Sequence, residues 1–240
     1  MSSRTFVVGD LHGCVDELEV LLEGLALTAG DNVIFLGDYV DRGPASSAVI
    51  ERLIRLRNEG PACVFLRGNH EDMFLAYMGL GGLYGDAFLV NGGRATLRSY
   101  NLEGCERSEV AQRIPPAHRE FLQEGLREYE VTGGFLCVHA GINPLRALDQ
   151  QSAEDLLWIR EEFIRNHHRL PYTVLFGHTP TREVLLDLPY KVGLDTGLVY
   201  SNKLSCLELH SADLFQVKRG ERNLRRASLA RAFKALRPRS

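Results

Sequence analysis

Five short, continuous apolar runs constrain the fold of this chain more than any other feature of its sequence. They are rich in Val, Phe, Ile and Leu, and they cover residues 6–8, 33–36, 63–66, 135–138 and 174–176. Apolar runs without polar alternation are typical of strands that are covered on both faces. Helical patterns separate the first three runs, so the sequence predicts right-handed β-α-β units within an α/β fold.

The remaining segments suggest how the rest of the chain is organised. We interpret the glycine-rich segment Gly79–Asn101 as a loop-rich excursion over the site, and residues 115–130 as helical. Short runs from Val184 onward are typical of a second, more antiparallel sheet. No repeat or low-complexity linker is found, so residues 1–217 are expected to form one domain.

Composition and charge exclude several classes of protein. The net charge of −3 and the pI near 6.3 give no reason to expect nucleic acid as a partner. The five cysteines are scattered and never in C-x-x-C spacing, which indicates reduced thiols in a cytoplasmic protein. Neither a signal peptide nor a transmembrane segment is expected, because no apolar run is long enough.

The C-terminal segment 218–240 differs in charge from the rest. It holds nine basic residues and one acidic residue, a net charge of +8 that leaves −11 for the remainder. Apolar residues recur at helical spacing within it, so it is expected to be helical. One interpretation is a basic arm that contacts an acidic surface, such as a membrane, RNA or an acidic protein. The other, which we favour, is a solvated helix packed on the acidic body.

Each apolar run is followed by a glycine-containing turn that carries Asp, Asn or His. The five turns are Gly9-Asp10-Leu11-His12-Gly13, Gly37-Asp38-Tyr39-Val40-Asp41-Arg42-Gly43, Arg67-Gly68-Asn69-His70-Glu71, His139-Ala140-Gly141 and Gly177-His178-Thr179-Pro180. Ligands of open α/β sheets bind at the carboxyl ends of the strands. A single such turn is usually only a turn, but five in this position predict one shared site.

The side chains in these turns are typical metal ligands. Carboxylate, amide and imidazole groups without thiolates suit Mn²⁺, Fe or Zn²⁺ better than Ca²⁺, and we expect Mn²⁺. The number of candidates exceeds what one ion needs, so the sequence predicts two ions about 3.5–4 Å apart that share a carboxylate. The six candidate ligands are Asp10, His12, Asp38, Asn69, His139 and His178.

The motifs GDLHG, GDYVDRG, RGNHE, HAG and GHTP, in this order, resemble the metallophosphoesterases of the phosphoprotein phosphatase type. The resemblance runs from about residue 6 to about residue 210. It implies a calcineurin-like fold, in which two β-sheets are sandwiched between helices and two metals lie at one sheet edge. By motif, one metal would be held by Asp10, His12 and His178, the other by Asn69 and His139, and Asp38 would bridge both.

The resemblance also implies the remaining roles. His70, paired with Asp41, would protonate the leaving oxygen while a hydroxide that bridges the metals attacks phosphorus in line. Asp41 would fix the imidazole tautomer and raise the pKa of His70. Phosphate oxygens would be bound by Arg42, by Asn69 and by Arg160, which lies in a shorter motif, Trp158-Ile159-Arg160.

The substrate is left open between two branches of this resemblance. Val40-Asp41-Arg42-Gly43 and Glu71 resemble bacterial and phage serine/threonine protein phosphatases, so we expect phosphoserine, phosphothreonine or phosphotyrosine in a protein. The alternative is a symmetrical dinucleoside tetraphosphate hydrolase, and a lower-ranked one is an inactive phosphate-binding scaffold.

Several further residues have two interpretations each. Asp195 either orients a metal-bound histidine or forms an ordinary turn. Arg67 either assists the site or forms a structural ion pair. Four histidines lie outside any motif and are interpreted as surface or core residues: His118, His167, His168 and His210.

Overall fold

The apolar strands are buried on both faces, because helices cover one face of each sheet and the other sheet covers the opposite face. The computed structural model describes residues 3–234. On strand β2 (Asn32–Phe35), Val33 and Phe35 pack against helices, whereas Ile34 packs against a second sheet. Both faces of the strand are covered, which explains why its sequence does not alternate between apolar and polar residues.

The first sheet has seven strands in the order β12-β11-β10-β1-β2-β3-β4. Neighbours among β1, β2, β3 and β4 are parallel, and β10, β11 and β12 extend the sheet from β1 in antiparallel pairs. Besides β2, its strands are β1 (Thr5–Val8), β3 (Ala62–Leu66), β4 (Leu126–Arg127), β10 (Lys203–Glu208), β11 (Asp213–Lys218) and β12 (Leu224–Ser228).

The second sheet has five strands in the order β5-β6-β7-β9-β8. Its three central strands are parallel, and both edge strands are antiparallel to their neighbours. The strands are β5 (Tyr129–Thr132), β6 (Phe135–Val138), β7 (Thr173–Phe176), β8 (Leu185–Asp187) and β9 (Lys191–Gly193).

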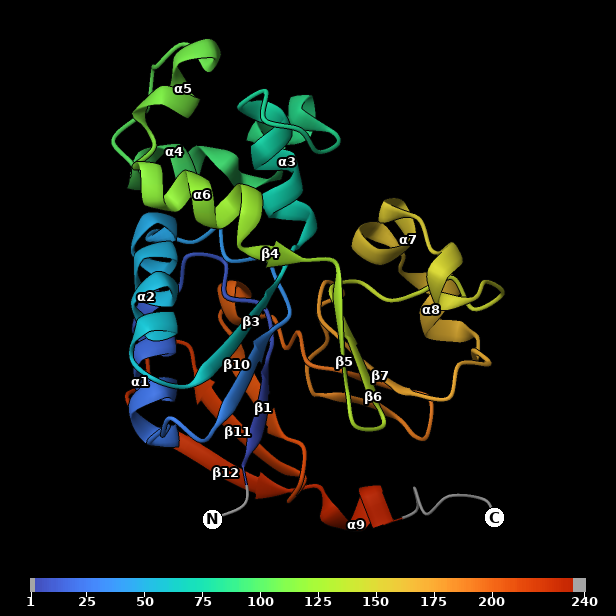
Figure 1. The fold of residues 1–240 in the computed structure, drawn as a ribbon. Helices are drawn as coiled ribbons and strands as arrows, with labels where there is room; N and C mark the ends of the chain where they lie inside the picture. Colours follow the sequence, from blue (N-terminus) through green and yellow to red (C-terminus); the bar gives the residue numbers. More distant parts are fainter. Residues whose placement is uncertain (1–2, 235–240) are drawn as a thin grey trace.

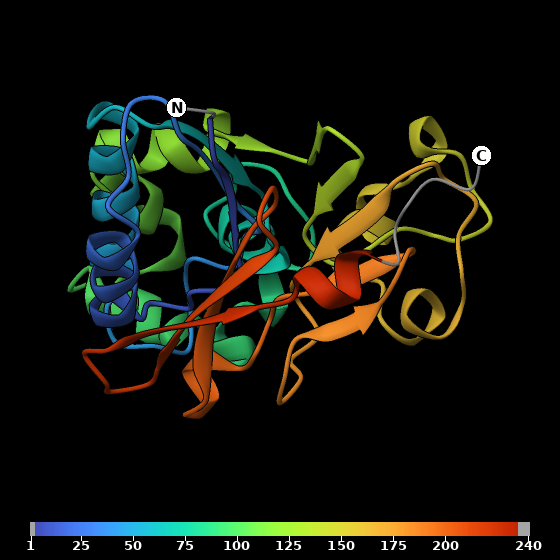
Figure 2. The same ribbon diagram turned by 90° about the horizontal axis from the view of Figure 1, so that it is seen from below.

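Helices cover the outer faces of both sheets. Helices α1 (Val15–Leu25) and α2 (Ser46–Asn58) pack on the first sheet, and α7 (Ala153–Trp158) and α8 (Glu161–Arg165) pack on the second. Figure 1 shows the two helix pairs on opposite sides of the molecule, and the turned view in Figure 2 agrees. The predicted fold, two sheets between helices, is confirmed.

The remaining helices gather mostly at one end of the first sheet (Figure 1). They are α3 (Asn69–Tyr77), η1 (Gly85–Ala87), η2 (Leu89–Gly93), α4 (Arg94–Ser99), α5 (Arg107–Arg113) and α6 (Pro116–Glu124), with η3 (Leu148–Gln150), η4 (Leu198–Tyr200) and α9 (Ala230–Phe233) elsewhere. None of the helices within residues 3–234 is long and apolar enough to cross a membrane.

The prediction of a loop-rich segment Gly79–Asn101 is wrong for most of its length. Its first residues are irregular, and most of the rest forms η1, η2 and α4. Glycine content misled the prediction, because buried Phe88 and Leu97 supply the apolar contacts that hold these short helices. The predicted helix at 115–130 also ends early, at Glu124, and β4 and β5 follow.

Strands beyond Val184 divide between the sheets, contrary to the prediction of one second sheet. β8 and β9 join the second sheet, whereas β10 pairs antiparallel with β1 in the first. The runs that form these strands look alike in sequence and all end in turns. The sequence therefore does not indicate which sheet each strand joins.

The prediction that residues 218–240 are helical is wrong for Leu224–Ser228, which forms the edge strand β12. β11 offers a free edge, and arginines are well tolerated on the solvated edge strand that pairs with it. The expected domain boundary at 217 thus falls within β11. Residues 235–240 lie outside the described part of the chain.

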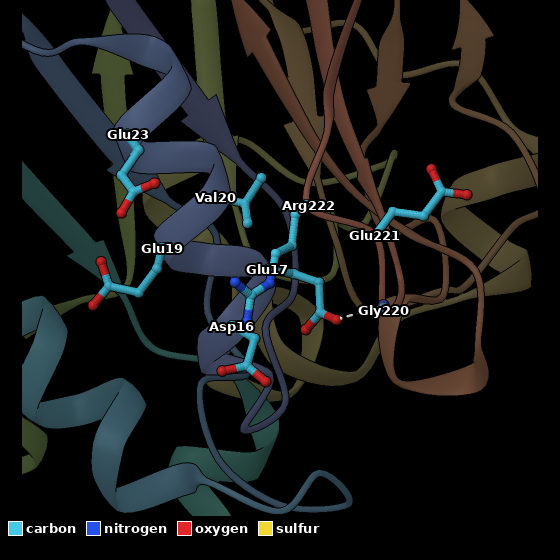
Figure 3. Close-up of a pocket in the computed structure, with 8 residues that line it drawn as sticks. All are labelled: Asp16, Glu17, Glu19, Val20, Glu23, Gly220, Glu221 and Arg222. Carbon is cyan, nitrogen blue, oxygen red and sulfur yellow. Dashed lines mark hydrogen bonds between the residues drawn. The ribbon is translucent and has the colours of Figure 1, made fainter.

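A buried carboxylate anchors the turn between β11 and β12. Glu17 of α1 accepts hydrogen bonds from the Gly220 amide at 2.8 Å and from Arg219 Nη1 at 2.6 Å. Figure 3 shows Glu17 reaching Gly220, with other acidic side chains of α1 nearby. Arg225 and Arg226 also form ion pairs, with Glu221 and Asp213. These basic residues therefore contact acidic groups of the chain's own fold.

Candidate functional site

The turns that follow β1, β2, β3, β6 and β7 meet at one edge of the two sheets, because parallel strands place their carboxyl ends together. All six candidate ligands are at most 4% exposed. Five site residues have left-handed backbone with φ between 43° and 71°: His12, Asp38, Asp41, Arg42 and His178. This conformation is unfavourable for residues other than glycine, so the surrounding contacts must impose it.

Glu71 shapes the turn that carries Asp38. Its buried carboxylate accepts hydrogen bonds from the amides of Asp38 at 2.9 Å, Tyr39 at 2.7 Å and Val40 at 3.2 Å. A fourth bond, from Gly68 at 2.9 Å, ties in the turn after β3. Glu71 thus fixes two turns of the site from behind.

Asp38 lies at the centre of the cluster. One carboxylate oxygen is 3.4 Å from His12 Nε2, and the other is 3.3 Å from His139 Nε2. Burial acts to raise the pKa of Asp38, but the surrounding histidines outweigh burial and hold that pKa well below its usual value. Asp38 is therefore an ionised group with an imidazole on each side.

Backbone carbonyl groups orient the two imidazoles. His12 Nδ1 donates to the Val40 carbonyl, and His139 Nδ1 donates to the Leu36 carbonyl, both at 2.8 Å. Each bond leaves Nε2 as an acceptor that faces Asp38. This tautomer is the one that metal-binding histidines use.

His178 lies with Asn69 and His139, which corrects the predicted division of the ligands. Asn69 Oδ1 is 2.9 Å from His178 Nδ1 and 3.0 Å from His139 Nε2. The family resemblance predicts that the His178 ring joins Asp10 and His12, but only the His178 backbone amide contacts Asp10, donating to Asp10 Oδ2 at 3.0 Å. The order of motifs along the chain could not reveal this.

The residues present fit two cations. Ligand atoms of His12, Asp38 and His70 lie within 4.8 Å of one another, and those of Asp38, His139 and His178 do so as well. Asp10 Oδ1 and His178 Nε2 are buried and have no hydrogen-bond partner within residues 3–234. Burial, with the charges of Asp195 and Asp38, raises the pKa of Asp10 well above its usual value, and nearby cations would relieve this cost.

His70 is held differently from the other imidazoles. Its Nδ1 is 2.6 Å from Asp41 Oδ2, so it contacts a carboxylate rather than a carbonyl group. Burial acts to lower the pKa of His70, but the charge of Asp38 and the bond with Asp41 raise it above its usual value. The predicted pairing of His70 with Asp41 is present in the structure.

The hydroxyl groups of Thr96 and Ser46 bind the Asp41 of this pair, and sequence reasoning missed both residues. Thr96 Oγ1 donates to Asp41 Oδ1 at 2.6 Å, and it accepts from the Asp41 amide at 2.8 Å. Ser46 Oγ also accepts from the Asp41 amide, at 3.1 Å. Thr96 belongs to α4, far along the chain, and no motif marks it.

The two arginines differ in their surroundings. Arg42 is partly buried, and its Nη1 is 2.6 Å from His12 Nε2. Its guanidinium also lies over the ring of Tyr200, 5.6 Å from the ring centre. Arg160 is exposed and lies between α7 and α8. Burial is the largest cause that lowers the pKa of His178, and the charge of Arg160 lowers this pKa further. Both arginines are thus near the cluster.

The structure also shows the contacts of the residues for which the sequence leaves two interpretations. Asp195 Oδ1 accepts from the Gly197 amide at 2.9 Å, which is the ordinary turn. Arg67 pairs with Asp72 at 3.5 Å. The histidines outside the motifs bind elsewhere: His118 contacts Tyr100 and Glu51, and His168 contacts the Tyr190 carbonyl.

Comparison with known proteins gives relatives whose names concern dinucleoside tetraphosphates. PrpE of Oceanobacillus iheyensis, an asymmetrical bis(5′-nucleosyl)-tetraphosphatase, is 25% identical over 238 residues, covering 88% of this chain and 90% of its own. The symmetrical bis(5′-nucleosyl)-tetraphosphatase of Cellvibrio japonicus is 31% identical over 151 residues. That match covers 62% of this chain and 49% of the relative, so the chain matches about half of that relative's length.

A solved structure has the same fold. This crystal structure, provisionally described as a diadenosine tetraphosphatase, has a TM-score of 0.69 and is 24% identical. The match covers 91% of this chain and 95% of that one. Residues 3–207 match the family described as calcineurin-like phosphoesterase. The match spans the second sheet, the first sheet as far as β10, and every turn of the cluster, and the chain therefore belongs to the calcineurin-like phosphoesterase family.

Proposed function

We propose that this phosphoesterase hydrolyses dinucleoside tetraphosphates, such as diadenosine tetraphosphate. The observation that carries the proposal is the similarity to PrpE, which covers 90% of that protein, together with the ligand cluster around Asp38. We therefore favour the dinucleotide alternative over the protein phosphatase that the motifs led us to expect.

The two residues that suggested a protein phosphatase face the interior. Glu71 and Asp41 are both 0% exposed, and their carboxylates bind groups of the protein itself. Residues in such positions shape the site but do not contact the part of a substrate that distinguishes a nucleotide from a peptide. Their presence is therefore weak support for a substrate class.

The cluster would hold the two divalent ions that the family resemblance implies. Asp10 and His12 would bind on one side of Asp38, with Asn69, His139 and His178 on the other. When bound, such ions supply Lewis acidity toward water and phosphoryl oxygens. Direct attack on phosphorus then needs no nucleophilic side chain from the protein.

His70 would give its proton to the leaving phosphate oxygen. Its contact with Asp41 orients the ring and helps to raise the pKa of His70, which favours the protonated form that an acid needs. A phosphate leaving group is a much weaker base than an alkoxide, so a tetraphosphate needs this proton less than phosphoserine does. Arg42 and Arg160 would neutralise the charge of the polyphosphate.

The test compares substrates on one preparation, stripped of metal and then restored with Mn²⁺. Diadenosine tetraphosphate and peptides with phosphoserine, phosphothreonine or phosphotyrosine are compared by kcat/KM. We expect the dinucleotide to be preferred and to yield ATP and AMP, as the name of PrpE indicates. ADP alone would indicate symmetrical cleavage, and preference for a peptide would overturn the proposal.

A protein phosphatase remains the second candidate. It is supported by the complete GDYVDRG and RGNHE motifs, whose His70–Asp41 pair suits a strongly basic leaving group. A higher kcat/KM for phosphopeptides than for diadenosine tetraphosphate would favour it.

A further inference from the structure

An aromatic pocket of about 290 Å³ lies next to the ligand cluster. Its lining comes from two separate regions: Tyr84, Ala87 and Asn91 from the η1–η2 region, and Glu154 and Trp158 from α7. The rings of Tyr84 and Trp158 meet edge to face, with centroids 5.2 Å apart and planes at 86°. They form a corner with two apolar walls.

The pocket lies beside the ligand cluster. The ring of Trp158 lies 6.2 Å from the ring of His178, measured between centroids. On the other side, Gly92 follows the pocket residue Asn91 and accepts a hydrogen bond from the Arg42 amide at 3.2 Å. Arg160, a proposed phosphate contact, is two residues after Trp158. A group in the pocket would therefore belong to a molecule whose phosphates reach both arginines.

The corner is exposed in a way that a packed core is not. Tyr84 is 49% exposed, and the Tyr84 hydroxyl is fixed by a bond to Glu154 Oε1 at 2.6 Å. Trp158 Nε1 is buried, and the described part of the chain supplies no hydrogen-bond partner for it. An exposed aromatic ring that a hydrogen bond holds in place is typical of a binding site rather than of a packed core.

We propose that this pocket binds one purine base of the dinucleotide, with the base stacked on Tyr84 or Trp158. The inference rests on the proposed function and names the part of the chain that selects its substrate. Stacking on aromatic side chains is the general way in which proteins hold unpaired bases.

Polar groups at the rim suit an adenine in particular. The exocyclic amino group of adenine is a donor, and acceptors are available in the Asn91 side-chain oxygen and the Glu154 carboxylate. A phosphopeptide would leave these groups without matched partners, so we favour the base as the occupant.

The first test uses Tyr84→Leu, with Tyr84→Phe as the matched control that keeps the ring. We expect Tyr84→Leu to lower kcat/KM for diadenosine tetraphosphate about 10- to 100-fold. Tyr84→Phe should stay within about 3-fold of the parent protein, because the ring is retained. For p-nitrophenyl phosphate, which has no base, kcat/KM should stay unchanged in both variants.

A second control is Val90→Ala, at a residue of the same segment that is 85% exposed and outside the pocket. It should match the parent protein on both substrates. Equal losses of Tyr84→Leu on both substrates, or no loss on the dinucleotide, would overturn the proposed pocket.

Binding can be followed without catalysis, since Trp158 is the only tryptophan in the sequence. ADP added to metal-stripped protein should change its fluorescence, whereas inorganic pyrophosphate should not. Tyr84→Leu should raise the ADP concentration at the midpoint of this fluorescence change about tenfold. Unchanged fluorescence with ADP would count against a base next to Trp158.

The two proposals fail in different ways. Hydrolysis of the dinucleotide that is insensitive to Tyr84→Leu would leave the function standing and remove the pocket from it. An ADP-dependent change in Trp158 fluorescence without dinucleotide hydrolysis would support the pocket and overturn the function.

Discussion

The ligand cluster and the aromatic pocket lie side by side but are built in opposite ways. Ligands in the cluster are at most 4% exposed and are held by hydrogen bonds from several turns. The pocket residue Tyr84 is 49% exposed and is held mainly through one bond to Glu154. We infer that the buried region sets the reaction shared by the family, whereas the exposed region sets the substrate.

The largest effect should come from Asp38→Asn, in the buried region. The substitution removes the charge between the two groups of ligands, so both ions should lose affinity together. Activity should fall to that of metal-stripped protein on every substrate, and metal analysis of the purified variant should find neither ion. A variant that keeps one ion would show that the two positions are independent.

His70→Asn should have the next largest effect, and its size should depend on the leaving group. General acids contribute about 10²- to 10⁴-fold, and a strongly basic leaving oxygen needs the proton most. We expect a larger loss for alkyl phosphates than for diadenosine tetraphosphate, with metal content unchanged. Equal losses on all substrates would argue against His70 as the acid.

The pH dependence offers a second check on His70. Because its pKa is raised, the proton is bound below that pKa, and activity should fall as the pH rises through it. This decline at high pH should disappear in His70→Asn. The same decline in both proteins would assign it to another group.

Gly92→Ala should cause an intermediate loss, because Gly92 joins the two regions. A Cβ atom there would lie 2.7 Å from Arg42 Cγ and 2.9 Å from the Arg42 amide, so the arginine must move. We expect kcat/KM to fall about 10- to 100-fold. Gly81→Ala is the matched control, since Gly81 has a similar φ of 96° and no atom of the described residues lies within 4 Å of its added Cβ. It should lose stability but keep its activity.

Glu17→Gln should have the smallest effect on catalysis, because Glu17 lies outside both regions. The free energy of unfolding should fall by about 1–3 kcal/mol as the bonds to Arg219 and Gly220 weaken. Glu19→Gln on the same helix is the control, because Glu19 is 39% exposed and should contribute less than about 1 kcal/mol. Urea denaturation measures both, and kcat/KM should stay unchanged.

The buried region was largely predictable from the sequence. Each ligand follows an apolar strand, and parallel strands bring their carboxyl ends together, so Asp10, Asp38 and Asn69 could be placed at one edge in advance. The side of Asp38 on which His178 lies was not predictable. It depends on how the two sheets face each other, which no local pattern records.

The exposed region was almost invisible in the sequence. Tyr84 and Trp158 are far apart along the chain, and an isolated aromatic residue usually indicates only packing. The glycines around Tyr84 suggested a loop, although buried Phe88 and Leu97 make much of that segment helical. The edge strand β12 was missed for a similar reason, because the free edge of β11 decides its structure.

One short segment carries a further consequence. Leu36–Val40 provides the Asp38 carboxylate, the carbonyl group that orients His139 and the carbonyl group that orients His12. The orientation of both imidazoles that flank Asp38 therefore depends on the backbone of this one segment. A substitution that shifts this backbone would displace the Asp38 carboxylate and both imidazoles together.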